Sequence, residues 1–275
     1  CFCRKGRIMD GNAQVISQAE ALLAELPAIT RPVVARYFRQ HFKVDLKSDN
    51  SPVTIADKLV EAEIRQAITS AFSSPDMACD IIGEEQGGEA NSRYSWVIDP
   101  IDGTRAFVVG RPIFGTLVAF VDNGQAVAGL IDMPMLDEAY LGGADGAVLV
   151  SAGKTQQINS SNVTSIEQAH IATTSPDAFS PDGLKLFDRL STQAAGRHYG
   201  GDCYNYALLG AGHLDIVMEH QLAPYDMMAL VAVLNGAGAT VTDWSGRPVT
   251  LDNDGSILAA ATAELHQQAL DIINS

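Results

Sequence analysis

The sequence predicts a layered α/β fold, in which an α+β N-terminal part is followed by an α/β C-terminal part. Two observations predict it. In the first half, helical patterns come before short apolar runs, and two of these runs are joined by Asn123-Gly124, a dipeptide typical of hairpins between antiparallel strands. In the second half, short apolar runs alternate with helical patterns, as in proteins whose sheets are covered by helices.

The first half begins with a helical pattern over residues 13–42, which we expect to be interrupted at Pro27 and Pro32. Thr54 and Asp57 form a capping signature that opens a second, amphipathic helix. The apolar runs that follow predict strands at residues 96–98, 115–121, 125–131, 140–141 and 147–150.

The second half predicts strands at residues 170–173, 214–219 and 240–242, and a helix over 182–193. Asp202 is a candidate N-cap of a helix that runs to Leu209, and Asp226 of an apolar helix that runs to Leu234. The glycines of Gly236-Ala237-Gly238 are expected to end that last helix. The expected organisation is an N-terminal extension (1–12), an α+β metal-binding subdomain (13–148) and an α/β subdomain that completes the site (149–275).

Composition excludes several classes of protein. The 275 residues are 47% hydrophobic and 19% charged, which is typical of a globular chain and not of a disordered one. With 18 basic and 33 acidic residues the net charge is −15, which disfavours nucleic-acid binding.

The longest uncharged stretch, residues 227–242, is too short and too rich in glycine to span a membrane. The four cysteines are scattered and predict no disulfide framework. No secretory signal is visible, so we expect a cytoplasmic protein.

Two clusters of acidic residues are the candidates for a metal- and phosphate-binding site. Gly83-Glu84-Glu85 follows an apolar pair, and Asp99-Pro100-Ile101-Asp102-Gly103-Thr104 follows the apolar run at 96–98. Proline and glycine predict a sharp turn in the second cluster, which would aim both aspartates and the Ile101 carbonyl at one point. Mg²⁺ prefers such an all-oxygen set, and Gly103-Thr104 would offer N–H groups and a hydroxyl to phosphate.

Each of these residues also has a plain structural explanation. Asp99 and Asp102 are common turn residues, Asp57 and Asp226 are ordinary helix caps, and an isolated Glu84 would be a solvated loop residue. The functional interpretation therefore depends on their combination.

That combination resembles the inositol monophosphatase family of Mg²⁺-dependent phosphatases. The resemblance runs from about Ala13 to Ala261, and the Asp-Pro-Ile-Asp-Gly-Thr hexapeptide at 99–104 is its most specific block. Glu84-Glu85, Pro224-Tyr225-Asp226 and the segment 47–54 match the family's other blocks in order.

Further blocks are similar to the histidinol-phosphatase branch of the family. They are the segments 102–107, 110–116, 200–207 and 212–219. Inositol phosphatases more often carry Trp-Asp where this chain has Tyr225-Asp226, and adenosine bisphosphate phosphatases usually carry Lys in place of Arg105.

The resemblance implies a layered αβαβα sandwich with the site between its two parts. It implies two or three Mg²⁺ per site, held by Glu84, Asp99, the Ile101 carbonyl, Asp102 and Asp226. Asp57 and Thr104 would orient a metal-activated water for in-line attack, and Glu84 would be the third catalytic residue. Substrate would be bound by Asp102, Gly103, Thr104, Arg105, Asp202, Glu219 and Asp226. Four ionised carboxylates would repel phosphate, and two Mg²⁺ would cancel their charge.

The expected activity is hydrolysis of L-histidinol phosphate, in histidine biosynthesis, by a homodimer that acts on a small phosphorylated substrate. Inositol-1-monophosphatase, or a broad-specificity sugar phosphatase, is the alternative among enzymes. A regulatory or binding member of the family is the alternative from another class.

Overall fold

The computed structural model describes residues 11–41, 44–46, 52–74 and 77–275. Most of the expected N-terminal extension and part of the 47–54 block lie outside the described residues. Within the described chain, Cys79 and Cys203 are free thiols, and no helix is both long and apolar enough to cross a membrane.

The helices are α1 (Gly11–Tyr37), α2 (Ile55–Ala71), α3 (Thr104–Val108), α4 (Pro181–Ser191), α5 (Cys203–Gly210), α6 (Pro224–Gly236) and α7 (Ala263–Ile273). The strands are β1 (Asp45–Leu46), β2 (Pro52–Val53), β3 (Cys79–Gly83), β4 (Tyr94–Asp102), β5 (Gly115–Asp122), β6 (Gln125–Met133), β7 (Glu138–Gly143), β8 (Gly146–Ser151), β9 (Lys154–Ile158), β10 (His170–Thr173), β11 (Gly196–Tyr199), β12 (Ile216–Glu219), β13 (Thr240–Thr242) and β14 (Ile257–Ala260).

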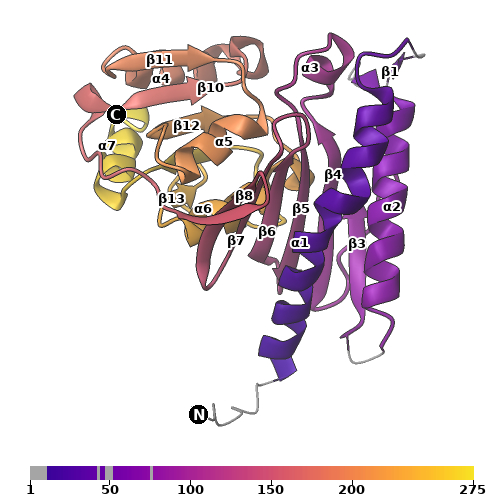
Figure 1. Ribbon diagram of the computed structural model, residues 1–275. Helices are drawn as coiled ribbons and strands as arrows, with labels where there is room; N and C mark the ends of the chain where they lie inside the picture. The colour runs from indigo at the N-terminus through magenta and orange to yellow at the C-terminus, as the bar shows by residue number, and fades with distance from the viewer. Residues whose placement is uncertain (1–10, 42–43, 47–51, 75–76) are drawn as a thin grey trace.

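These elements form five layers, which confirms the predicted αβαβα sandwich (Figure 1). Helices α1 and α2 cover one face of a seven-stranded sheet, and α5 and α6 pack between that sheet and a five-stranded one. Helices α4 and α7 cover the outer face of the second sheet.

The seven-stranded sheet has the order β3-β4-β5-β6-β7-β8-β9. Strand β3 is parallel to β4, and the remaining neighbours are antiparallel. Asn123 and Gly124 connect β5 to β6 with φ values of 49° and 78°, so the predicted hairpin is confirmed. The predicted boundary at 148–149 falls within β8, and the chain changes sheet later, between Ile158 and His170.

Helix α1 corrects one prediction, because it continues without interruption through Pro27 and Pro32. Both prolines lack the N–H that an interior helical residue donates. The buried residues Leu22, Leu26 and Val34 pack this helix on the apolar core of the sheet, and this tertiary packing outweighs the loss of two hydrogen bonds.

The five-stranded sheet has the order β11-β10-β12-β14-β13, with β10 parallel to both of its neighbours and β14 antiparallel to both of its own. The predicted strands and helices of this half are present, with shifted ends. Helix α6 ends at Gly236, as the glycine pair predicts.

Candidate active site

Three aspartates from distant parts of the chain meet at one point. Asp99 and Asp102 lie at the end of β4, and Asp226 lies in the first turn of α6. One carboxylate oxygen from each lies within 4.8 Å of the other two. Three of the metal ligands predicted from the sequence therefore lie together in the fold.

The geometry at Asp99 and Asp102 differs from the sharp turn expected there. Strand β4 continues to Asp102, and its register against β5 shifts so that Asp99 pairs with Leu117 but Asp102 with Gly115. One extra residue on β4 makes this a β-bulge, which re-aims side chains without ending the strand. The chain turns only at Gly103, whose φ of 82° lies in the left-handed region.

Asp226 also corrects a prediction. It is the third residue of α6, not its N-cap, and its Oδ2 accepts the backbone N–H of the N-cap residue Ala223 at 2.7 Å, which is one half of a capping box. The carboxylate is thus fixed by the first turn of the helix while it adjoins Asp99 and Asp102.

Glu84 lies in the turn that follows β3, and its N–H donates to the Ile98 carbonyl at 3.1 Å, next to Asp99 on β4. Burial is the largest cause of the raised pKa values of Asp57, Asp99 and Asp226, and repulsion from Glu84 adds to it. Glu84 is therefore the fourth carboxylate of the cluster.

Burial and mutual repulsion make this cluster unfavourable as four bare charges. Burial, followed by repulsion from neighbouring carboxylates, raises the pKa values of Asp99 and Asp102 well above their usual range. Burial, with repulsion from Glu84, raises the pKa of Asp226 to about 7. A closely spaced, largely buried, all-oxygen set with excess negative charge fits a hard divalent cation such as Mg²⁺.

Asp57 and Thr104 also meet. Thr104 Oγ1 lies 3.5 Å from Asp57 Oδ1 and donates to the Ile101 carbonyl at 2.9 Å. Asp57 Oδ2 accepts the N–H and hydroxyl of Thr54, at 2.7 and 2.5 Å. One carboxylate oxygen of Asp57 therefore caps α2, and the other faces Thr104. Burial is the largest effect on the Asp57 pKa and raises it.

Beside the cluster lies a cavity of about 120 Å³ that adjoins an outer cleft of about 680 Å³. Asp102, Asp202, Glu219 and Asp226 line the cavity, and Asp202 lines the cleft as well. Arg105 lies in the outer cleft and not in the carboxylate cluster.

Asp202 occupies the N-cap position of α5, but its side chain makes no capping hydrogen bond. Its φ of 46° with ψ of −139° is a strained conformation for a residue other than glycine. Burial raises its pKa to about 6, while the charges of Arg105 and Arg111 act in the opposite direction. The expected cap is therefore wrong, and the carboxylate lies instead on the wall shared by the cavity and the cleft.

Glu219 ends β12 and is buried. Its two oxygens accept the Thr174 N–H at 2.7 Å and the Tyr206 hydroxyl at 3.0 Å. Any substrate contact must use the remaining lone pairs of these oxygens.

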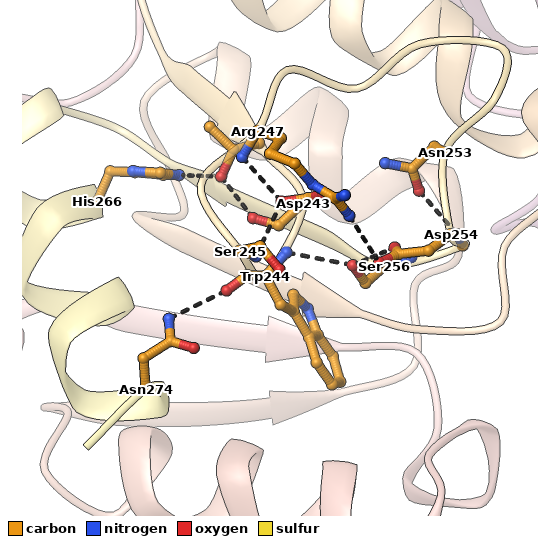
Figure 2. Close-up of polar contacts among 11 residues, drawn as sticks. Asp243, Trp244, Ser245, Arg247, Asn253, Asp254, Ser256, His266 and Asn274 are labelled. Carbon is orange, nitrogen blue, oxygen red and sulfur yellow. Dashed lines mark hydrogen bonds and ion pairs between the residues drawn. The ribbon is translucent and has the colours of Figure 1, made fainter.

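His220, which lines the cavity and was not predicted from the sequence, is packed against the segment between β13 and β14. The carboxylate of Asp243 accepts the N–H groups of Ser245 and Arg247 at 2.8 Å (Figure 2). This holds Trp244, whose ring packs against His220 with 4.8 Å between centroids. His220 lines both the cavity and the cleft.

Proteins of one family resemble this chain over most of its length. The model of the inositol monophosphatase family matches residues 15–275. The bifunctional phosphatase IMPL2 of Arabidopsis thaliana is 39% identical, over 87% of this chain and 70% of that protein. A histidinol-phosphatase of Mycobacterium tuberculosis is 30% identical, over 94% of this chain and 96% of that protein.

Among solved structures, an inositol monophosphatase of Zymomonas mobilis superposes with a TM-score of 0.83 at 35% identity, and covers 94% of this chain and 98% of the other. This chain belongs to the inositol monophosphatase family, a family of metal-dependent phosphatases.

Proposed function

We propose that this protein is a Mg²⁺-dependent histidinol-phosphatase, which hydrolyses L-histidinol phosphate to L-histidinol and phosphate. The observation that carries the proposal is the position of the Asp202 carboxylate, on the wall between the acidic cluster and the outer cleft. The leaving group carries an ammonium and an imidazole that can protonate, and both are recognised by anionic acceptors. With a pKa of about 6, Asp202 is mostly ionised at neutral pH.

Glu84, Asp99, Asp102, Asp226 and the Ile101 carbonyl would hold the metal. When bound, Mg²⁺ supplies charge that offsets the carboxylates, lowers the pKa of water and stabilises the oxygens of the transferring phosphoryl group. We propose two or three ions per site, of which two Mg²⁺ match the charge of the four ionised carboxylates.

The roles of the protein's own groups follow from their contacts. Thr104 lies between Asp57 and the Ile101 carbonyl, so its hydroxyl and the Asp57 carboxylate can orient the attacking water and accept its proton. Asp57 is held for this by its bonds to Thr54. The backbone N–H groups at Gly103 and Thr104 open α3 and are suited to bind phosphate oxygens.

A substrate panel tests the proposal. Phosphate release with Mg²⁺ is measured from L-histidinol phosphate, inositol 1-phosphate and adenosine 3′,5′-bisphosphate. We expect a preference of roughly 100-fold or more in kcat/KM for L-histidinol phosphate, equivalent to about 2.7 kcal/mol. Similar rates on the first two substrates would favour a broad monoesterase instead. Absence of turnover on any of them would favour a binding or regulatory role.

We also propose that the protein acts as a cytoplasmic homodimer. Sedimentation of the purified chain tests the oligomeric state, and a monomer at micromolar concentration would contradict it.

A further inference from the structure

Helix α2 carries a buried carboxylate to which the proposed mechanism gives no role. Glu61 is 0% exposed and lies one turn beyond Asp57. Its Oε2 accepts the N–H of Glu85 at 2.8 Å, and its Oε1 accepts the N–H of Gln86 at 3.1 Å. Glu61 therefore binds the backbone of the turn that carries Glu84.

Arg65, one further turn along the same helix, completes the contact. Its Nε donates to Glu61 Oε1 at 2.7 Å, and its Nη2 donates to the Gly87 carbonyl at 2.5 Å. Its Nη1 donates to the Ile81 carbonyl at 3.4 Å. Glu61 and Arg65 thus bind the turn itself, and Arg65 also binds the backbone before it, at Ile81, and at its end, at Gly87.

The turn has little freedom to move. Gly83 and Gly87 exchange two backbone hydrogen bonds, at 3.1 and 2.9 Å. A Cβ on Gly83 would lie 2.2 Å from Glu61 Oε1, so this close approach requires glycine. Glu84 itself is bonded through its N–H to the Ile98 carbonyl of β4.

A buried carboxylate is costly unless its lone pairs are satisfied, and here they are satisfied by the turn next to the acidic cluster. Asp57 and Glu61 are four residues apart, and so on one face of α2. One points to Thr104 and the other to the Glu84 turn. A single helix face therefore sets the position of two separate parts of the site.

We propose that Glu61 and Arg65 are positioning residues that fix the Glu84 carboxylate against Asp99 and Asp226 and thereby set the affinity of the cluster for Mg²⁺. The proposal rests on the metal site of the proposed function and is independent of the substrate. Outer groups of this kind typically change metal affinity by 10–100-fold when they are removed.

Glu61→Gln tests the proposal, because it replaces one acceptor oxygen with an NH₂ that faces the N–H groups of the turn. Mg²⁺ binding to the metal-depleted protein is measured by calorimetry, together with the Mg²⁺ concentration that gives half-maximal phosphatase activity. We expect the dissociation constant for Mg²⁺ and the half-maximal Mg²⁺ concentration each to rise by roughly 10-fold or more. The value of kcat should recover at saturating Mg²⁺.

Asp132→Asn is the matched control. Asp132 is also a fully buried carboxylate of this half, paired with an arginine from a helix, since Arg31 Nη2 donates to it at 2.8 Å. It holds no part of the Glu84 turn. This variant should lose stability but keep the wild-type affinity for Mg²⁺.

Arg65→Lys is the second variant, and it stands in if Glu61→Gln does not fold. It keeps the charge, loses the fork of donors to Gly87 and Ile81, and should weaken Mg²⁺ binding in the same direction. Wild-type affinity in the folded variants, or an equal loss in Asp132→Asn, overturns the proposal. Failure of the wild-type protein to bind Mg²⁺ would instead overturn the metal site of the proposed function.

Discussion

The backbone N–H of Cys203 donates to Asp102 Oδ2 at 2.6 Å, across 101 positions of the sequence. Asp102 ends β4 of the seven-stranded sheet, and Cys203 opens α5 between the two sheets. The bond opposes the effect of burial on the Asp102 pKa, because it stabilises the ionised carboxylate. One carboxylate of the acidic cluster is thereby held from both halves of the chain.

Asp102→Asn should abolish turnover without loss of the fold. The amide oxygen can still accept the Cys203 N–H, but a negative charge is lost from the cluster. Loss of several kcal/mol of charge stabilisation corresponds to a fall of roughly 10³-fold in kcat/KM. Removal of one repelling charge should also raise the melting temperature of the metal-free protein. Phosphate release and thermal melting measure both effects, and activity within about 10-fold of wild type would contradict the assigned role.

Mg²⁺ and protons should compete for the acidic cluster. The folded pKa of Asp226, about 7, lies above the usual unfolded value of about 4. Its contribution to stability is therefore fully present below about pH 4 and is lost as the pH rises through about 7. The contribution of Asp226 to the melting temperature of the metal-free protein should therefore decrease as the pH rises over this range.

Because Mg²⁺ binds the ionised carboxylates, the increase in melting temperature that it causes should grow from pH 5 to pH 8. At 100 times its dissociation constant Mg²⁺ should add about 2.7 kcal/mol, or roughly 5–10 °C. Melting curves with Mg²⁺ and with a chelator measure this difference. An increment that stays constant or shrinks as the pH rises would be incompatible with competition.

Most of the layer order and the acidic cluster could be predicted from local sequence signals, but several elements could not. Strand β9 is Lys-Thr-Gln-Gln-Ile and has almost no apolar pattern, because it is an edge strand. Strand β11 is also a polar edge strand. These elements are specified by pairing with a neighbour that is already in place, which a local pattern does not contain.

Prediction of the site from local sequence signals has the same limit. Asp99, Asp102 and Asp226 were found because their residue types and motifs are specific. The bulge at β4 was not found, because proline and glycine predict a turn equally well. Glu61 was missed because a glutamate in an amphipathic helix is usually on the exposed face, and only the tertiary structure shows that it is buried.

Asp202→Asn should weaken recognition of a cationic leaving group. The carboxylate lines both the cavity and the cleft, and hydrogen bonds to charged groups contribute about 1.5–3 kcal/mol. We expect kcat/KM for L-histidinol phosphate to fall by roughly 10–100-fold, and that for inositol 1-phosphate to fall less. Asp177→Asn is the control, because Asp177 lines the same cleft but is exposed and does not line the cavity. An equal loss on both substrates would assign Asp202 to the architecture of the site and not to specificity.

Gly103→Ala and Gly124→Ala should separate backbone strain from damage to the site. Both glycines have positive φ, 82° and 78°, so each alanine should cost about 1–2 kcal/mol of stability. A Cβ at Gly103 would lie 3.0 Å from Asp202 Cγ, whereas a Cβ at Gly124 has no atom within 4 Å. Only Gly103→Ala should therefore lower kcat/KM, because it must displace either Asp202 or the start of α3 that carries Thr104. Urea unfolding and phosphate release measure the two effects in each variant. Equal activity of the two variants at equal loss of stability would show that the contact between Gly103 and Asp202 has no part in catalysis.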